Sequence, residues 1–175
     1  FSWSIPTPLT EYDARPYWSD TVSFGADIYV AWESGDIFFQ HSEDRGHTWS
    51  EPTRIAETPL LSHRARITRD EAGVLHVVWD DADEQDEGYI IWYARSVDNG
   101  QTWDQPVELY NREGIPGGGS AWWPSVATTG SQIIVAWVQS SALFSAHSGD
   151  SGRTWSLSSS FYDTKQHGWG YIDLV

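Results

Sequence analysis

Short runs of alternating apolar and polar residues fill this chain, and no segment carries the 3.6-residue apolar period of a helix. Three runs are alike, because each is an apolar stretch that ends in tryptophan, at Asp27–Trp32, Leu75–Trp79 and Gln132–Trp137. A turn glycine and a further short apolar run precede each of them, at 20–24, 66–68 and 125–127. Runs of this length between turn residues predict β-strands.

Two more strands are predicted after each tryptophan. The first covers 37–41, 89–95 and 143–147, and the second covers 51–56, 105–110 and 157–162. Between these two strands lies the motif S-x-D-x-G-x-T-W, which reads SEDRGHTW, SVDNGQTW and SGDSGRTW in the three copies. Four strands in a unit that recurs about every 50 residues predict an all-β chain built as the four-stranded antiparallel blades of a β-propeller.

Every motif residue has a structural task in a hairpin. The aspartate can accept backbone N–H bonds from its own turn, and the glycine supplies a positive φ. The threonine restarts the strand, and the tryptophan buries a large ring between blades. One turn repeated three times suits a scaffold better than an active site, which is normally assembled once. The motif residues are Ser42, Asp44, Gly46, Thr48, Trp49, Ser96, Asp98, Gly100, Thr102, Trp103, Ser148, Asp150, Gly152, Thr154 and Trp155.

The three motifs resemble the Asp box, or bacterial neuraminidase repeat, of sialidase-like β-propellers. The resemblance covers essentially the whole chain and implies a six-bladed ring when complete. It is specific for the propeller and not for sialidase activity, because Asp boxes also occur in receptors, other hydrolases and assembly factors.

The two ends of the chain match parts of a blade. Phe1–Ser4 resembles the end of the motif, and Trp169–Leu174 resembles a first strand. We therefore expect an outer strand of a preceding blade at 1–13, blades at 14–62, 63–120 and 121–168, and the inner strand of a following blade at 169–175. Three blades cannot close a ring. The chain is then either an excerpt of a longer propeller or a half-propeller completed by a second copy.

Sialidase chemistry, as the resemblance implies it, needs an arginine cluster, an acid/base aspartate, and a tyrosine activated by a glutamate. The nearest match to the first arginine motif is Ala14–Tyr17, which lacks the aromatic residue and the isoleucine. Asp20 and Asp27 fall in or beside predicted strands. No sialidase site is visible in these residues.

The ligand face of such a propeller lies opposite the motif hairpins. Trp18, Trp123 and Trp169 take equivalent positions at the start of an inner strand, and Trp122 adjoins one of them. Their rings could stack on sugars or simply pack around the axis. In the second blade this position reads Ser62–Arg66 instead, so Arg64 or Arg66 could hold a ligand carboxylate or pair with nearby acids.

An acidic run at 80–87 follows the second of these tryptophan-ending strands. Asp80 and Asp81 are the best placed of its residues to face a ligand. The spacing matches no calcium loop, so a solvated charge run is the simpler interpretation. The histidines show no metal spacing, and the Gly117–Gly119 loop lacks the lysine of a phosphate loop, so no metal or cofactor is predicted.

Net charge and the length of the apolar runs restrict the classes of partner that the chain could bind. The net charge of −15 disfavours nucleic acid, and no apolar run is long enough to span a bilayer. With no Met in the chain, we expect an N-terminus made by processing or cutting. The leading hypothesis is a secreted or cell-surface propeller segment that binds carbohydrate or an extracellular protein. The alternatives are part of a sialidase-type glycoside hydrolase with its site completed by other blades, and a purely structural or assembly propeller.

Overall fold

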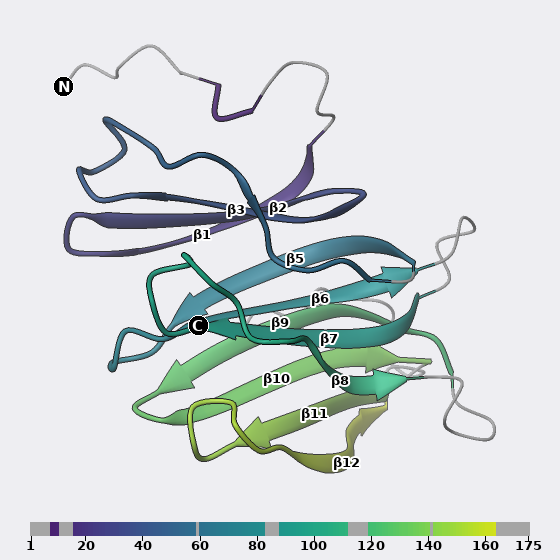
Figure 1. The fold of residues 1–175 in the computed structure, drawn as a ribbon. Coiled ribbons are helices and arrows are strands. Elements are labelled where there is room, and N and C mark those ends of the chain that lie inside the picture. The colour runs from purple at the N-terminus through teal and green to yellow at the C-terminus, as the bar shows by residue number, and fades with distance from the viewer. Residues whose placement is uncertain are drawn as a thin grey trace, which may run out of the picture.

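The protein is all-β, as a computed structural model shows for residues 8–10, 16–58, 60–82, 88–111, 119–140 and 142–163. Its strands form three four-stranded antiparallel sheets, and each sheet is a meander in chain order. The three sheets stack face to face in Figure 1, with the second sheet between the other two. The predicted fold class, four-stranded antiparallel blades, is confirmed.

In each sheet the strands follow chain order from the inner edge to the outer edge. The first contains β1 (Tyr17–Phe24), β2 (Asp27–Ser34), β3 (Asp36–Ser42) and β4 (Thr53–Arg54). The second contains β5 (Leu61–Arg69), β6 (Leu75–Ala82), β7 (Gly88–Ser96) and β8 (Val107–Asn111). The third contains β9 (Ala121–Thr129), β10 (Gln132–Gln139), β11 (Ala142–Ser148) and β12 (Ser156–Asp163).

Proline sets the length of the outer strands. In the first two sheets Pro52 and Pro106 stand directly before β4 and β8, which therefore start later than the sequence pattern predicts. Proline has no N–H to donate to the ladder, so a strand begins after it. The third sheet has Ser158 at the equivalent position, and β12 begins at Ser156, directly after the motif.

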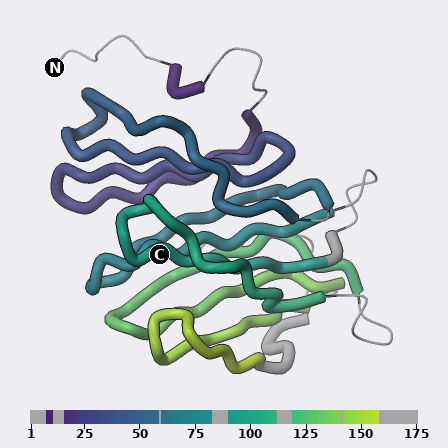
Figure 2. The backbone as a smooth tube through the Cα atoms, viewed as in Figure 1, coloured from purple at the N-terminus to yellow at the C-terminus, as the bar shows by residue number. Residues whose placement is uncertain are grey.

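Apolar side chains fill the two spaces between the sheets. The cluster between the first and second sheets includes Tyr29, Phe39 and Trp79, and the cluster between the second and third includes Tyr93 and Trp137. Trp79 is fully buried, and Trp137 is 2% exposed. The backbone traces in Figure 2 show how closely the successive sheets follow one another.

Each inner strand contains a bulge near its start. The pairing register shifts between Tyr17 and Ser19, between His63 and Arg66, and opposite Trp123. Trp18, Arg64 and Trp123 have positive φ angles of 28°, 56° and 53°. Positive φ is uncommon for residues other than glycine. Because this conformation recurs at one position of every inner strand, the bulge is a regular feature of the fold.

Of the outer strand predicted at 1–13, residues 1–7 and 11–13 lie outside the described residues, and Leu9 and Thr10 form a bend. The inner strand predicted at 169–175 lies wholly outside the described residues. Within the described ranges, no helix is long and apolar enough to cross a bilayer.

Candidate functional site

The three motif hairpins share one hydrogen-bonding pattern. In the first, the Thr48 N–H donates to Asp44 Oδ1 at 2.8 Å, and the Thr48 hydroxyl donates to Asp44 Oδ2 at 2.7 Å. The Gly46 N–H donates a hydrogen bond to the Ser42 hydroxyl oxygen, and the Ser42 hydroxyl in turn donates one to Asp44. The same bonds recur around Asp98 and around Asp150.

These hydrogen bonds stabilise the ionised aspartates. The Thr48 bonds lower the pKa of Asp44 to about 2, and the Thr154 bonds lower that of Asp150 to about 2. The Thr102 bonds lower the pKa of Asp98 in the same way. Such carboxyl groups hold no proton to donate at neutral pH. The hairpins therefore suit a structural role and not acid catalysis.

Each of the last two hairpins also receives an aromatic ring from the preceding sheet. Phe39 of β3 meets Trp103 edge to face at 5.3 Å between ring centroids, and Tyr93 of β7 meets Trp155 at 4.7 Å. The same rings lie against the hairpin glycines, so a Cβ on Gly100 would come within 2.1 Å of Phe39. The motif tryptophans of the second and third hairpins thus pack against the sheet that precedes them.

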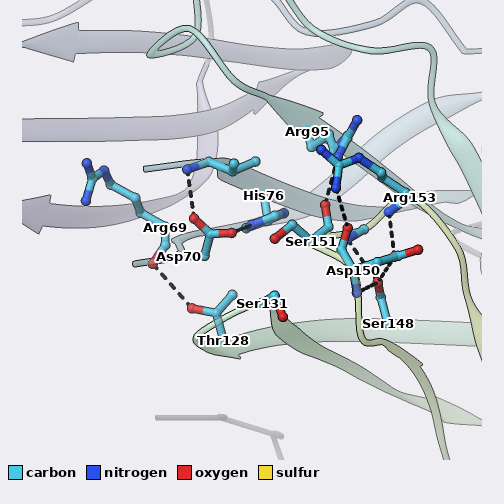
Figure 3. A network of polar contacts seen from close by, with 12 residues as sticks. Arg69, Asp70, His76, Arg95, Thr128, Ser131, Ser148, Asp150, Ser151 and Arg153 are labelled. Carbon is cyan, nitrogen blue, oxygen red and sulfur yellow. Dashed lines mark hydrogen bonds and ion pairs between the residues drawn. The ribbon is translucent and has the colours of Figure 1, made fainter. Parts of the chain in front are cut away.

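A polar network strengthens the second of these junctions. Arg95 donates to the Ser151 carbonyl of the third sheet's hairpin and to Asp104, as Figure 3 shows for Ser151. Beneath it, the buried His76 ring lies 3.4 Å from Asp70 and 2.7 Å from the Tyr93 hydroxyl. Burial lowers the pKa of His76 to about 4, so this histidine is neutral in the folded protein.

A second polar cluster lies at the opposite end of the sheets, where β5 starts and β6 ends. Arg64 occupies the bulge position that Trp18 and Trp123 occupy in the other sheets. Its guanidinium donates to Asp80 Oδ2 at 2.5 Å, and the Asp80 side chain has no exposed surface. Asp80 also accepts a backbone hydrogen bond from Trp123 of the third sheet.

Burial and Arg64 act in opposite directions on Asp80. Desolvation raises its pKa, the Arg64 charge lowers it, and the pKa stands at about 7. The group can therefore exchange a proton near neutral pH. A perturbed carboxyl group of this kind at the end of a sheet is a feature of functional sites.

The first sheet contributes Glu33 to the same cluster. Glu33 is 4% exposed and accepts the backbone N–H of Arg64 through Oε2, and its Oε1 lies 3.5 Å from His63 Nδ1. The hydrogen bond to Glu33 raises the pKa of His63. Glu33, His63, Arg64 and Asp80 thus form one charged cluster across the junction of two sheets.

Asp81, the neighbour of Asp80, is bound inside the second sheet. Its Oδ1 accepts hydroxyl bonds from Ser62 and Thr58, and its Oδ2 accepts the indole N–H of Trp92 at 2.8 Å. With its oxygens occupied and its side chain buried, Asp81 holds the strand ends of the second sheet in place.

The aromatic candidates differ in exposure. Trp18 is 56% exposed and Tyr17 beside it 65%, while Trp122 and Trp123 are half-buried. Trp169 lies outside the described residues. The described rings stand at the same end of the sheets as Arg64, because all of them lie at the start of an inner strand.

The other polar candidates either lie within strands or fall outside the described residues. Arg66 is half-buried in β5, and Asp20 accepts the N–H of Ile67 at 2.9 Å across the first junction. Residues 83–87 of the acidic run lie outside the described part. Within the described part, no group of three or more His, Asp or Glu residues could hold a metal ion.

Sequence reasoning singled out Arg64 and Asp80 but missed Glu33. Glu33 follows Trp32 as Asp80 follows Trp79, so the repeat itself contained the signal. Its contact with Arg64 depends on how two sheets pack, which the pattern within one sheet does not contain.

The fold of the three sheets is that of β-propeller glycosidases, among them arabinanases and sialidases. The chain superposes on an α-L-arabinofuranosidase, Arb93A, from Fusarium graminearum with a TM-score of 0.62 and 17% identity, covering 85% of this chain and 49% of that one. An α-L-arabinanase from Penicillium chrysogenum gives a TM-score of 0.61 at 16% identity, with 85% and 50% covered. The NanB sialidase from Streptococcus pneumoniae gives 0.59 at 12% identity, with 85% and 44% covered.

These similarities show a shared fold. The chain spans about half the length of the enzymes it matches. No family model and no curated protein matches the sequence.

Proposed function

We propose that the chain forms part of an extracellular propeller that binds carbohydrate at the end where its inner strands start. Further blades, from a longer chain or a second copy, would complete the ring. The observation that carries the proposal is Arg64, which replaces tryptophan at a bulge position repeated in the sheets. Its side chain is 13% exposed, and its guanidinium pairs with a buried carboxylate.

The surroundings of Arg64 suit a sugar. Arginine offers several N–H donors in a fixed plane, which matches carboxylate and hydroxyl groups. The exposed indole of Trp18 presents an apolar face at the same end of the sheets, and sugar rings stack on such faces. Charged and aromatic groups together are the usual makings of a ligand site. The solved enzymes of this fold include one bound to arabinobiose, which supports a saccharide as ligand.

A glycan array that includes arabino-oligosaccharides and sialosides tests the proposal. We expect binding by the wild-type protein and at least about tenfold weaker binding by Arg64→Ala, since a charged hydrogen bond contributes roughly 1.5–3 kcal/mol. Arg54→Ala is the matched control, because Arg54 is also ion-paired but lies on the outer strand β4. Equal signal from the two variants would remove Arg64 from the site.

A glycoside hydrolase is the second candidate, and the pKa of Asp80 favours it. A carboxyl group with a pKa of about 7 is still partly protonated at neutral pH, as a general acid must be. The candidate ranks second because Asp80 is fully buried beneath Arg64. It predicts release of the aryl group from an aryl arabinoside or sialoside and loss of that release in Asp80→Asn. No turnover of either substrate would exclude it for these sugars.

A further inference from the structure

We propose that Glu33 and Asp80 are positioning residues, each of which holds the backbone of the bulge residue in the next sheet and so fixes the ligand-facing side chains of Arg64 and Trp123. The inference rests on the proposed ligand face, which it extends from the side chains that would meet a sugar to the carboxylates that orient them.

The two carboxylates occupy one position of the repeat. Glu33 directly follows Trp32, the single tryptophan of β2, and Asp80 directly follows Trp79, the single tryptophan of β6. The pairing registers agree with this equivalence, because Ala31 pairs with Asp20 and Val78 pairs with Arg66. The third sheet has Val138 at this position.

Both carboxylates accept a hydrogen bond from the same backbone position. The Arg64 N–H donates to Glu33 at 2.5 Å, and Asp80 accepts a backbone hydrogen bond from Trp123. A carboxylate at the end of one sheet therefore meets the bulge of the next sheet twice in the molecule.

The receiving residues need such a partner. Arg64 and Trp123 are held at φ angles of 56° and 53°, a conformation that costs a residue other than glycine roughly 1–2 kcal/mol. A bulge also takes its extra residue out of the strand ladder, so that its N–H lacks the usual carbonyl. A hydrogen bond to a buried carboxylate offsets both costs.

The same carboxylates also reach side chains of the cluster. Asp80 binds the Arg64 guanidinium as well as the Trp123 backbone, so one group links two bulges. Glu33 lies beside the His63 ring as well as the Arg64 backbone. The direction in which each ligand-facing side chain leaves the strand thus depends on the sheet before it.

Residue-resolved amide hydrogen exchange by NMR tests this assignment without a ligand. In Glu33→Ala, we expect the Arg64 amide to exchange at least about tenfold faster while the Trp123 amide is unchanged, the shift that loss of a hydrogen bond of ~1.4 kcal/mol produces. In Asp80→Ala the pattern reverses. The fully buried Val77 of β6 reports global stability in every variant.

Conservative variants complete the test. Glu33→Gln and Asp80→Asn keep an acceptor oxygen, so we expect protection close to that of wild type. If Glu33→Ala fails to fold, Glu33→Gln still decides, because the neutral acceptor should move the Arg64 amide proton upfield relative to wild type.

Two results would overturn the proposal. One is an Arg64 amide whose exchange and proton shift do not respond to any change at Glu33. The other is a uniform loss of protection at Arg64, Trp123 and Val77, which would make Glu33 a general packing residue. Absence of glycan binding would overturn the proposed function and leave these exchange patterns as they are.

Discussion

Asp80 is the residue in which burial and charge compete most directly. Its carboxyl group has no exposed surface, which raises its pKa, and the Arg64 guanidinium opposes that rise. The balance near pH 7 allows the ion pair to form or dissolve within the physiological range. Arg64 is therefore a cation whose partner can be neutralised by a proton.

The titration of Asp80 in Arg64→Ala measures this competition. Because the arginine lowers the pKa of Asp80, we expect its removal to move that pKa above about 7. The change is followed by carboxyl ¹³C NMR from pH 5 to 9. Arg66→Ala serves as the control on the same strand, since Arg66 is not among the groups that shift Asp80. A pKa that falls or stays constant in Arg64→Ala would contradict the interpretation of the pair.

Single residues were predicted from the sequence where they interrupt a repeat. Arg64 stands out because the three equivalent positions, Trp18, Trp123 and Trp169, are tryptophan. The ligand-facing role of Asp81 stays a prediction, and its oxygens bind Ser62, Thr58 and Trp92. These bonds depend on side chains from neighbouring strands and from the β4–β5 connection, so a linear pattern of charges does not reveal them.

Among the elements, the motif hairpin has a fixed internal structure, and in the second and third sheets it also contacts the preceding sheet. All three hairpins have the same Ser, Asp and Thr hydrogen bonds, and their glycines have φ angles of 84°, 82° and 80°. Only the second and third hairpins have an aromatic ring of the preceding sheet against the glycine, among the residues that the structure describes. Substitutions in the three hairpins therefore separate the free-energy cost of backbone strain from that of steric crowding by a neighbouring ring.

Alanine substitutions at these glycines measure the two costs. At Gly46 the new Cβ would find no atom closer than 3.6 Å, so we expect only the conformational cost of roughly 1–2 kcal/mol. At Gly100 and Gly152 it would also meet the Phe39 ring and the Tyr93 hydroxyl, which adds about 1–3 kcal/mol. Urea unfolding of the three variants gives the comparison. Equal losses of stability would show that the aromatic contacts do not constrain the hairpins.

The strand boundaries also depend partly on the local sequence and partly on contacts between strands and sheets. The sequence pattern located all twelve strands of the three sheets. It placed the start of β4 and β8 too early, because Pro52 and Pro106 remove a ladder donor. It did not predict the bulges at Trp18, Arg64 and Trp123, which lie near the starts of β1, β5 and β9.

The molecule as a whole is held together by its two sheet junctions. The motif end is fastened by aromatic rings and the Arg95 network, and the opposite end by Glu33 and Asp80. The fold was predictable because each sheet repeats the same local pattern. The candidate site was only partly predictable, since half of it depends on contacts between sheets.

The pH dependence of stability reports on both ends. The pKa of His76 is about 4 in the folded protein, below its ordinary 6.5, so the unfolded chain takes up the proton first. The free energy of unfolding therefore falls as the pH drops from 6.5 to 4. Asp80 acts in the opposite sense, because its folded pKa of about 7 exceeds the ordinary 3.8 and acidification between these values stabilises the fold.

His76→Gln isolates the histidine contribution. We expect the variant to be less stable at pH 7 but to lose less stability on acidification, by on the order of 3 kcal/mol between pH 6.5 and 4. Urea unfolding at several pH values gives the slopes, and the exposed His147→Gln is the control. A slope identical to that of wild type would assign the acid sensitivity to other groups.

Chemical-shift mapping with arabinobiose and with an α-sialoside tests the location of the ligand face most directly. The account predicts that at least one of these sugars shifts the amide resonances of Arg64, Trp18 and Trp123. It predicts unchanged resonances for Gly46, Gly100 and Gly152 in the motif hairpins. Shifts confined to the motif hairpins, or no shift with either sugar at millimolar concentration, would contradict it.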